Sequence, residues 1–307
     1  MKISVVMPCH NTGPWIQQAL QSVAAQTRAA HEIIVVNDSS TDDTVEQIRS
    51  SGIKVRFLDT RLGNAAAARN LGIKSAEAEW IAFLDGDDVW CSNHLDRASL
   101  ACMPHDVACF SQYSRLVDGQ PLSPSTTSLA ILAGDTRGGI PASRLCENRQ
   151  GIVNGWPTSG MLIRRDRLLQ IGGFDESLKR RHDTELFFRA AHGHTFALQF
   201  TPTWHYRIRS EGNISSNLVE CTAYFLSALK KLEALYGSEE MKSLVHHQAR
   251  VALGAAVRSC DREAIETVYK LAEKELPPHW RLSKRFWLSF PRAGVLLRPK
   301  TRKTKAI

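Results

Sequence analysis

Short apolar runs alternate with amphipathic stretches through the first 84 residues, and this alternation constrains the fold more than any other feature of the chain. Buried strands are expected at residues 3–7, 32–36, 54–58 and 80–84. Helices are expected at residues 14–26 and 64–75. A third helix is expected to follow a turn and N-cap at residues 37–41 and to end near residue 52. Continuous apolar strands joined by helices indicate a parallel sheet covered on both faces, and right-handed crossovers make it a Rossmann-like unit. The sequence therefore predicts an α/β fold.

The remainder of the chain is less regular. Residues 118–154 are rich in Gly, Pro, Ser and Thr and are expected to form a long loop. Further strands are expected at 159–163, 196–200 and 204–208, with helices at 165–171 and 183–191. From residue 219 the pattern is helical, with helices expected at 219–236, 239–259 and 262–276. We therefore expect a main domain at residues 1–215 and a C-terminal helical region at 216–307.

The positive charge of the chain is concentrated at its C-terminal end. Nine of the 39 basic residues follow Glu275, where no acidic residue occurs, so the rest of the chain is nearly neutral against its 31 acidic residues. Residues 280–290 interleave cations with large apolar side chains, a pattern typical of a segment lying on an anionic membrane surface. The alternative is an ordinary helix packed on the main domain, followed by a cationic end. Nucleic-acid binding is not expected, because the basic residues are confined to this tail and no nucleic-acid motif occurs.

Cysteine usage and hydropathy bear on the compartment. The seven cysteines are odd in number and form no CxxC pair, which argues against a disulfide framework or a zinc site and favours a reducing compartment. No secretory signal peptide is recognised at the N-terminus, and no apolar stretch is long enough to cross a bilayer. We expect a cytoplasmic protein, or one bound peripherally to the inner face of a membrane.

An acidic cluster ends the fourth predicted strand. Asp85, Asp87 and Asp88 directly follow an apolar run, and clustered carboxylates at such a place need a counter-ion or water. In an extended segment the side chains of Asp85 and Asp87 point to the same side, and Gly86 between them lets the backbone approach a ligand closely. Such carboxylates suit a divalent cation with attached phosphates. The alternative is a polar turn, because Asp and Gly are good turn formers.

The neighbouring polar segments favour a ligand site over a turn. Ligands of parallel sheets bind beyond the carboxyl ends of the strands, and the polar residues 8–11, 37–39 and 85–88 all fall on that rim. An EF-hand is excluded, because a loop that starts at Asp85 lacks the Gly required at its sixth position. Neither the GxGxxG of a dinucleotide site nor a Walker-type loop occurs, so phosphate binding here would rely on a metal.

Six segments taken together resemble the inverting glycosyltransferases of family two. They are residues 5–11 (VVMPCHN), 32–44 (EIIVVNDSSTDDT), 67–72 (AARNLG), 83–88 (FLDGDD), 172–177 (GGFDES) and 183–189 (DTELFFR). The order and spacing of these segments make the resemblance specific over roughly the first two thirds of the chain. It implies the GT-A fold, a Rossmann-like and mostly parallel central sheet flanked by helices. The C-terminal helices form an extension outside the resemblance.

The resemblance also implies how the donor binds. Pro8, Asn11 and Gly86 belong to the nucleotide cradle, and Asp38 accepts a hydrogen bond from the ring N–H of the base, normally uracil. Arg69 contacts the nucleotide or its diphosphate. Asp38 could instead only cap a helix, and Arg69 could be a solvated charge on a helix face.

The metal and the catalytic groups follow in the same way. Asp87 is the implied ligand of Mg²⁺ or Mn²⁺, Asp85 contacts ribose or a metal-bound water, and Asp183 is the general base. His182 stands where the family often has Glu. Asp183 could alternatively cap its helix or pair with the basic run 179–181.

The remaining candidate residues concern a third metal ligand and the acceptor. His205 is a further candidate metal ligand, although a lone histidine is more often structural. The acceptor side is expected at Trp156, Thr158 and Ser159, with Trp156 equally suited to a core position.

The resemblance predicts transfer of a sugar from a nucleotide-diphosphate donor, with a UDP-sugar preferred, to a hydroxyl of a glycan or lipid-linked glycan in cell-surface polysaccharide synthesis. Two other functions remain open. A non-catalytic nucleotide-sugar-binding protein would keep the cradle and lose turnover. A sugar nucleotidyltransferase would share the sheet and the acidic metal site, but it would be expected to carry a Gly-rich phosphate loop, which this chain lacks.

Overall fold

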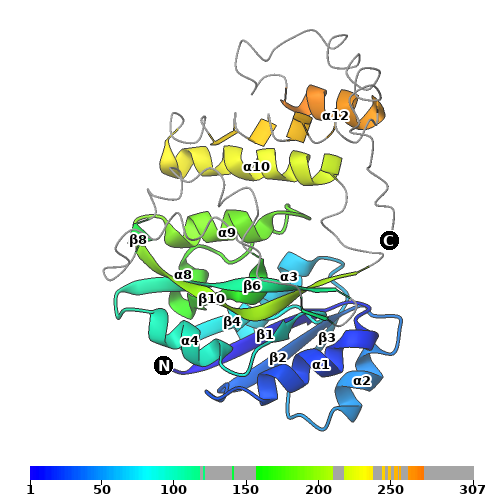
Figure 1. Cartoon of the computed structure of the whole chain (residues 1–307), viewed down its shortest axis with the longest axis vertical. Coiled ribbons are helices and arrows are strands. Elements are labelled where there is room, and N and C mark those ends of the chain that lie inside the picture. The colour runs from blue at the N-terminus through cyan, green and yellow to red at the C-terminus, as the bar shows by residue number, and fades with distance from the viewer. Residues whose placement is uncertain are drawn as a thin grey trace, which may run out of the picture.

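The structure is a computed structural model of the whole chain, arranged as a sheet between layers of helices (Figure 1). It describes residues 1–117, 120–121, 140–141, 157–209, 218–237, 244–245, 248–249, 252–254, 256 and 262–272. Most of the predicted loop at 118–154, most of the predicted helix at 239–259 and the basic tail lie outside the described residues.

The N-terminal half of the sheet is parallel. Its strand order is β3 (Arg56–Thr60), β2 (Glu32–Asp38), β1 (Ile3–Cys9) and β4 (Trp80–Phe83). The connecting helices are α1 (Gly13–Ala24), α2 (Thr44–Ser50) and α3 (Ala65–Ser75). These elements confirm the predicted alternation, and Asn64 caps α3 by accepting from the backbone N–H groups of Ala66 and Ala67. The prediction for α2 was wrong at its start, since the helix begins at Thr44, with Asp43 at the N-cap position.

The other half of the sheet is mixed in direction. Beyond β4 the order continues with β9 (Met161–Arg164), β6 (Asp106–Val117), β10 (Thr195–Ile208) and β5 (Val89–Trp90). Strand β9 runs antiparallel to β4 and β6, whereas β6 and β10 are parallel. The short strands β7 (Gln120–Pro121) and β8 (Ile140–Pro141) pair with β6 and β10.

Two expectations for this half were wrong. The strands predicted at 196–200 and 204–208 are one strand, because β10 passes through a register shift between Gln199 and Trp204 without leaving its partner. The expected strand at 159–163 starts later, after a 3₁₀ turn at Thr158–Gly160. Strand β6 was not predicted, since its polar residues, such as Gln112, are buried and break the apolar run.

Helices cover both faces of the sheet and create two cores. On one face α1, α2 and α4 (His94–Ala101) pack against alternate strand residues such as Val5 and Met7. On the opposite face α3, α8 (Arg165–Gln170) and α9 (His182–Ala191) pack against the intervening residues, such as Val6. Helix α10 (Leu218–Tyr236) lies over α9, where the Tyr236 hydroxyl donates to the Phe188 carbonyl over 2.8 Å, and α12 (Arg262–Ala272) lies over α10. No helix among the described residues has the length and apolar composition needed to cross a bilayer.

Candidate active site

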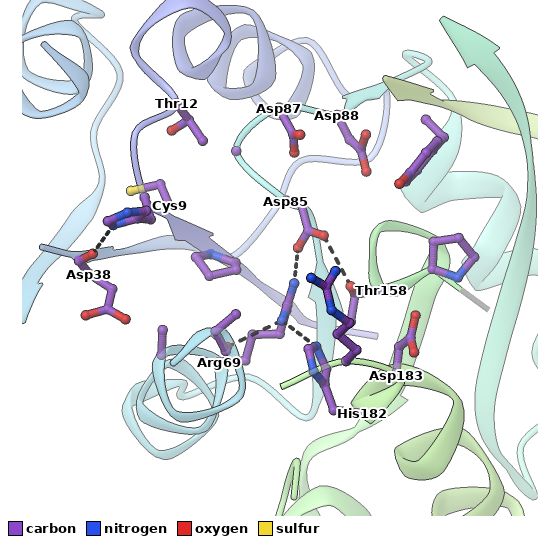
Figure 2. A pocket seen from close by; sticks show the side chains of 18 of the residues that line it. Cys9, Thr12, Asp38, Arg69, Asp85, Asp87, Asp88, Thr158, His182 and Asp183 are labelled. Carbon is purple, nitrogen blue, oxygen red and sulfur yellow. Dashed lines mark hydrogen bonds and ion pairs between the residues drawn. The ribbon is translucent and has the colours of Figure 1, made fainter. Parts of the chain in front are cut away.

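A cavity of about 690 Å³ opens at the carboxyl ends of β1, β2 and β4, on the rim predicted from the polar segments. Its walls also include the start of α3, the residues before α9 and the end of β10. The predicted site residues that line it are Pro8, Asp38, Arg69, Asp85, Gly86, Asp87, Thr158 and Asp183. Figure 2 places Asp38 and Asp183 on opposite sides of this cavity, with Arg69 and Asp85 between them.

The acidic turn after β4 is closely packed. The backbone N–H of Asp85 donates to Ser159 Oγ over 3.1 Å, and the N–H of Asp88 closes the turn on the Asp85 carbonyl over 3.0 Å. A Cβ at Gly86 would lie 3.0 Å from Thr12 Oγ1, so a larger residue there would press on the wall of the cavity. Gly86 therefore lets the turn pack against α1 while Asp85 and Asp87 line the cavity.

Arg69 connects this turn to the start of α9. Its NH2 donates to Asp85 Oδ1 over 2.5 Å, and its NH1 lies 3.0 Å from Nε2 of His182 (Figure 2). The opposite ring nitrogen, Nδ1, lies 3.2 Å from the Leu178 carbonyl and donates to it, which assigns Nε2 as the acceptor for Arg69. Burial and the nearby charge of Arg69 lower the pKa of His182, so its ring is neutral. Arg69 is therefore a buried cation, not a solvated charge on a helix face.

Asp87 faces a second cation. Its Oδ2 lies 2.6 Å from NH2 of Arg209, whose guanidinium stacks over the Trp15 ring at 4.1 Å. The backbone carbonyl of Asp87 accepts from Nε of Arg207 over 2.6 Å. Burial, and then repulsion from Asp85, raise the pKa of Asp87, while Arg209 acts in the opposite direction. The sequence drew attention to Asp87 but gave no sign of its pairing with Arg209.

Asp88 is part of the framework. It is buried, and its two oxygens accept from Ser159 Oγ over 2.5 Å and from the backbone N–H of Arg207 over 2.9 Å. Burial raises the pKa of this carboxyl well above its usual range. Asp88 thus joins the acidic turn to β10 and to the segment before β9.

The Asp38 carboxylate organises the loop that leads into α3. Its Oδ1 accepts from the backbone N–H groups of Leu62 and Gly63 at 2.6 and 2.9 Å, and its Oδ2 accepts from Asn64 at 2.8 Å. Ser39 Oγ also donates to Oδ1 over 3.4 Å. Oδ2 accepts only the bond from Asn64 among those of the described residues, so it is the oxygen with room for another donor. Asp38 lies at the end of β2 and is not the N-cap of α2, where Asp43 stands.

Pro8 and Asn11 have different positions at the end of β1. Pro8 lines the cavity, whereas Asn11 does not. Asn11 has a left-handed backbone, with φ 51°, and its side-chain oxygen accepts from the backbone N–H of Thr41 over 2.8 Å. Its own N–H donates to Ser40 Oγ over 3.0 Å. Asn11 therefore fixes the loop after β2 at Ser40 and Thr41.

Asp183 lies in the first turn of α9 and lines the cavity opposite Asp38 (Figure 2). Its Oδ1 accepts from the backbone N–H of Thr184 over 2.7 Å. Arg181, the N-cap residue of α9, has φ 60°, a left-handed conformation that turns the chain into the helix. The carboxylate thus sits at the positive end of the α9 dipole on a sharply turned segment.

The turn at residues 172–175 positions α9 from behind. Asn70 bonds twice to Phe174, accepting from its N–H over 2.7 Å and donating to its carbonyl over 2.9 Å. Arg189 forms an ion pair with Glu185 and donates to the Gly173 carbonyl over 2.7 Å. Gly173 has φ +71°, and a Cβ there would come within 2.3 Å of Asn70 Oδ1. These residues, all from the segments that carry the family resemblance, hold α9 in place without lining the cavity.

His205 is not brought together with Asp87 in the cavity wall. Its Nδ1 lies 2.6 Å from Ser114 Oγ on β6, and its Nε2 lies 3.6 Å from Cys91 Sγ. Both ring nitrogens are therefore directed at neighbouring side chains, those of Ser114 and Cys91.

The expected acceptor residues separate in the same way. Thr158 lines the cavity and donates to Asp85 Oδ2 over 3.3 Å. Ser159 is fully buried and bonds to the acidic turn, so it supports the site from behind. Trp156 lies outside the described residues.

More cations line the cavity than the sequence predicted. The basic residues of the wall are Arg69, Arg115, Lys179, Arg180, Arg181 and Arg209, against Asp38, Asp85, Asp87, Asp88 and Asp183. The run at 179–181 is visible in the sequence, but its place on the cavity wall depends on the turn before α9. This mixture of charges suits an anionic ligand that also carries a cation.

The residues present fit a divalent cation held mainly by its substrate. Asp85 and Asp87 offer hard oxygens two residues apart on one wall, as Mg²⁺ and Mn²⁺ prefer. Burial and repulsion from Asp85 raise the pKa of Asp87, and the charge of a nearby cation, Arg209, acts in the opposite direction. Among the described residues no group of three or more His, Cys, Asp and Glu side chains is arranged to hold a metal. Phosphate and water would therefore complete the coordination shell.

Comparisons with known proteins point to one family. A family model described as "Glycosyl transferase family 2" matches residues 4–169. An uncharacterized glycosyltransferase of Nostoc sp. is 30% identical over 186 residues, covering 57% of this chain and 54% of that protein. The UDP-Glc:alpha-D-GlcNAc-diphosphoundecaprenol beta-1,3-glucosyltransferase WfgD of Escherichia coli is 36% identical over 96 residues, covering 31% of this chain and 38% of that protein. The chain spans from 14% to 58% of the length of the curated relatives it matches.

Solved structures share the fold. TarS of S. aureus, residues 1–349 in complex with UDP-GlcNAc, superposes with a TM-score of 0.67 at 17% identity, covering 96% of this chain and 92% of that one. The mannosyltransferase PcManGT of Pyrobaculum calidifontis, in complex with GDP-Man and Mn²⁺, gives a TM-score of 0.58 at 16% identity, covering 96% and 87%. These likenesses show the GT-A fold, as the sequence predicted.

Proposed function

The chain belongs to glycosyl transferase family 2, and from that premise we propose that it moves a sugar from a nucleotide-diphosphate donor to a hydroxyl of an acceptor glycan. The observation that carries the proposal is the convergence of Asp85, Asp87, Arg69 and Asp183 on one cavity at the carboxyl rim of the sheet. The proposed donor is a UDP-sugar, and the proposed acceptor is a glycan or lipid-linked glycan of a cell-surface polysaccharide. Two relatives support this choice by their names, the UDP-Glc:alpha-D-GlcNAc-diphosphoundecaprenol glucosyltransferase and a putative teichuronic acid biosynthesis glycosyltransferase.

The nucleotide is proposed to lie on the Asp38 side of the cavity. Pro8 and Gly86 leave space for the backbone to approach it, and Asp38 Oδ2, which accepts one bond, has room to accept from the N–H of the base. Arg69 stands between this side and Asp183, where its charge suits the diphosphate. When bound, Mg²⁺ or Mn²⁺ held at Asp87 would supply charge stabilisation for the leaving diphosphate.

Asp183 is proposed to act as the general base. Its carboxylate takes the proton of the acceptor hydroxyl as that oxygen attacks the anomeric carbon. The new bond forms on the face opposite the leaving diphosphate, and the bond from the anomeric carbon to the phosphate oxygen breaks. This single displacement inverts the anomeric configuration. Thr158, on the Asp183 side of Asp85, is the described residue proposed for the acceptor side, with Trp156 and Ser159 as further candidates.

The proposed location is cytoplasmic, at or near the inner face of a membrane. The basic residues after Glu275, which lie outside the described residues, are the proposed contact with anionic lipid. An enzyme held at the membrane would then meet a membrane-bound acceptor at the surface where that acceptor is made.

The test is nucleotide release from a panel of UDP-, GDP- and dTDP-sugars with Mn²⁺. We expect one donor class to be turned over, Asp87→Ala to abolish turnover, and Asp183→Asn to keep nucleotide binding while losing transfer by roughly 10²–10⁴-fold. Asp166→Asn, on exposed α8 outside the cavity, is the matched control and should transfer normally.

Two outcomes would count against the proposal. No binding or hydrolysis above the Asp87→Ala background would remove the transferase function. Donor binding with no transfer in the unmodified chain, across a panel of acceptors, would instead favour a nucleotide-sugar-binding protein.

A further inference from the structure

The carboxylate proposed to hold a metal already has a cation of its own. Arg209 NH2 lies 2.6 Å from Asp87 Oδ2, and the two side chains are only 19% and 21% exposed. An ion pair in such a sheltered position is less screened than a surface pair. Asp87 is therefore neutralised by the fold itself.

The position of Arg209 is fixed from several sides. Its guanidinium lies over the Trp15 ring of α1 at 4.1 Å, a cation–π contact. Two residues earlier, Arg207 is bound to the acidic turn through its backbone N–H, which donates to Asp88 Oδ1 over 2.9 Å. The Arg207 guanidinium also bonds to Gln18 of α1 over 2.6 Å. The end of β10 is thus tied to the acidic turn and to α1, and these contacts place Arg209 beside Asp87.

A guanidinium and a divalent cation cannot share one carboxylate at low cost. Like charges within a few ångströms repel, and the repulsion is stronger in a partly buried cavity than in water. A metal ion that takes Asp87 must therefore displace Arg209 from it. Arg209 would remain on the cavity wall, where phosphate oxygens are suitable partners for a guanidinium.

We propose that Arg209 competes with the divalent cation for Asp87. Arg209 weakens metal binding in the absence of nucleotide, and it pairs with the phosphates instead when nucleotide is present. The inference rests on the proposed function in taking Asp87 as the metal ligand and the cavity as the nucleotide site. Metal binding is thereby coupled to the donor, because a free metal must break the ion pair whereas a metal–nucleotide complex offers Arg209 a new partner.

Direct binding measurements test the competition without any turnover. Mn²⁺ affinity is measured by electron paramagnetic resonance and calorimetry on the full chain, first without nucleotide and then with UDP. We expect Arg209→Gln to bind free Mn²⁺ about tenfold more tightly than the unmodified chain, the effect of removing one close cation from a carboxylate. The same variant should bind UDP more weakly when no metal is present.

Three further variants locate the effect. Arg209→Lys keeps the charge and should keep Mn²⁺ binding weak. Arg28→Gln removes an arginine from an exposed pair with Asp96 and should leave Mn²⁺ affinity unchanged. Asp87→Asn should abolish the binding gained in Arg209→Gln when the two are combined.

The outcomes separate the two proposals. Unchanged or weaker Mn²⁺ binding in Arg209→Gln, with a thermal unfolding profile that shows a folded chain, would overturn the competition. An equal gain in Arg28→Gln would overturn it too, because the effect would then reflect net charge. Tighter Mn²⁺ binding in Arg209→Gln without turnover of any nucleotide sugar would support the competition while removing the transferase function.

Discussion

The Arg69 guanidinium lies 2.5 Å from the Asp85 carboxylate, and the Arg69 side chain is only 6% exposed. A buried arginine is tolerated only with such a partner, because an unpaired charge in this position would be strongly destabilising. The other terminal nitrogen bonds to neutral His182 and not to a second carboxylate. Asp85 is therefore the sole anionic partner of Arg69 among the described residues. Through its bonds to Asp85 and His182, Arg69 ties the turn after β4 to the start of α9.

The coupling between Arg69 and Asp85 is measurable in a double-mutant cycle. We expect Arg69→Met and Asp85→Asn each to lower the free energy of unfolding, and the double variant to lose about 2 kcal/mol less than their sum. Urea denaturation of the four proteins measures the coupling. The exposed pair Arg56–Glu77, with N···O 3.6 Å, is the control and should couple by less than about 0.5 kcal/mol. A coupling near zero at Arg69–Asp85 would contradict the buried ion pair.

The three amide bonds to Asp38 give a second prediction. In Asp38→Asn one carboxylate oxygen becomes an NH₂ group, which cannot accept from the backbone N–H groups at residues 62–64. The free energy of unfolding should fall by about 2 kcal/mol, since hydrogen bonds to charged groups contribute roughly 1.5–3 kcal/mol each. Denaturant unfolding measures the change. Asp43→Asn, at the exposed start of α2, should cost much less. Equal stability of the two variants would show that Asp38 has no structural role.

The contact between α3 and β1 gives a third prediction. A Cβ at Gly72 would lie 2.3 Å from Val6 Cγ1, so Gly72→Ala forces this helix away from the sheet. We expect a loss of about 1–3 kcal/mol of stability, the usual cost of overpacking. Val6→Ala should partly rescue it, because removing the two methyl groups makes room for the new one. Calorimetric unfolding of both single variants and the double variant tests this. No rescue would mean that the loss comes from another source.

The parts of the fold that could be predicted from sequence are those that local chemistry specifies. Strands β1 to β4 are continuous apolar runs, and the helices between them have one apolar face, so period and length identify them. Strand β6 could not be found this way, because its polar residues Ser111, Gln112 and Ser114 are buried, and Ser114 meets its partner His205 only in the folded sheet. The two strands predicted at 196–200 and 204–208 are one, because the pairing of β10 continues through an irregularity that contains Pro202, a residue that ends strands in most contexts.

The candidate site divides along the same line. Asp38, Arg69, Asp85, Asp87 and Asp183 were identified from motif positions, and all five line one cavity. Their partners could not be predicted, because the pairs Asp87–Arg209 and Arg69–Asp85 depend on which strand ends meet. Sequence spacing says nothing about a contact between the end of β10 and the turn after β4. Likewise, His205 has the residue type of a metal ligand, and only the sheet register directs its ring to Ser114.

His94 gives the last prediction, on the dependence of stability on pH. Its ring is buried, stacks on Trp90 at 4.4 Å and bonds to Thr203 Oγ1 over 2.9 Å, and burial lowers its pKa to about 3. In the unfolded chain a histidine titrates near pH 6.5. Between these values the unfolded state binds a proton that the folded state excludes, so the free energy of unfolding falls as the pH falls. From pH 7 to pH 5 the loss due to His94 should be about 2 kcal/mol.

Urea unfolding at pH 7 and pH 5 isolates this contribution. The drop in stability should be smaller by about 2 kcal/mol in His94→Gln than in the unmodified chain, because glutamine does not titrate. Exposed His31 provides the matched variant, and His31→Gln should keep the full pH dependence. If His94→Gln lost as much stability between the two pH values as the unmodified chain, the proton would be binding elsewhere and the ring of His94 would be accessible to it in the folded state.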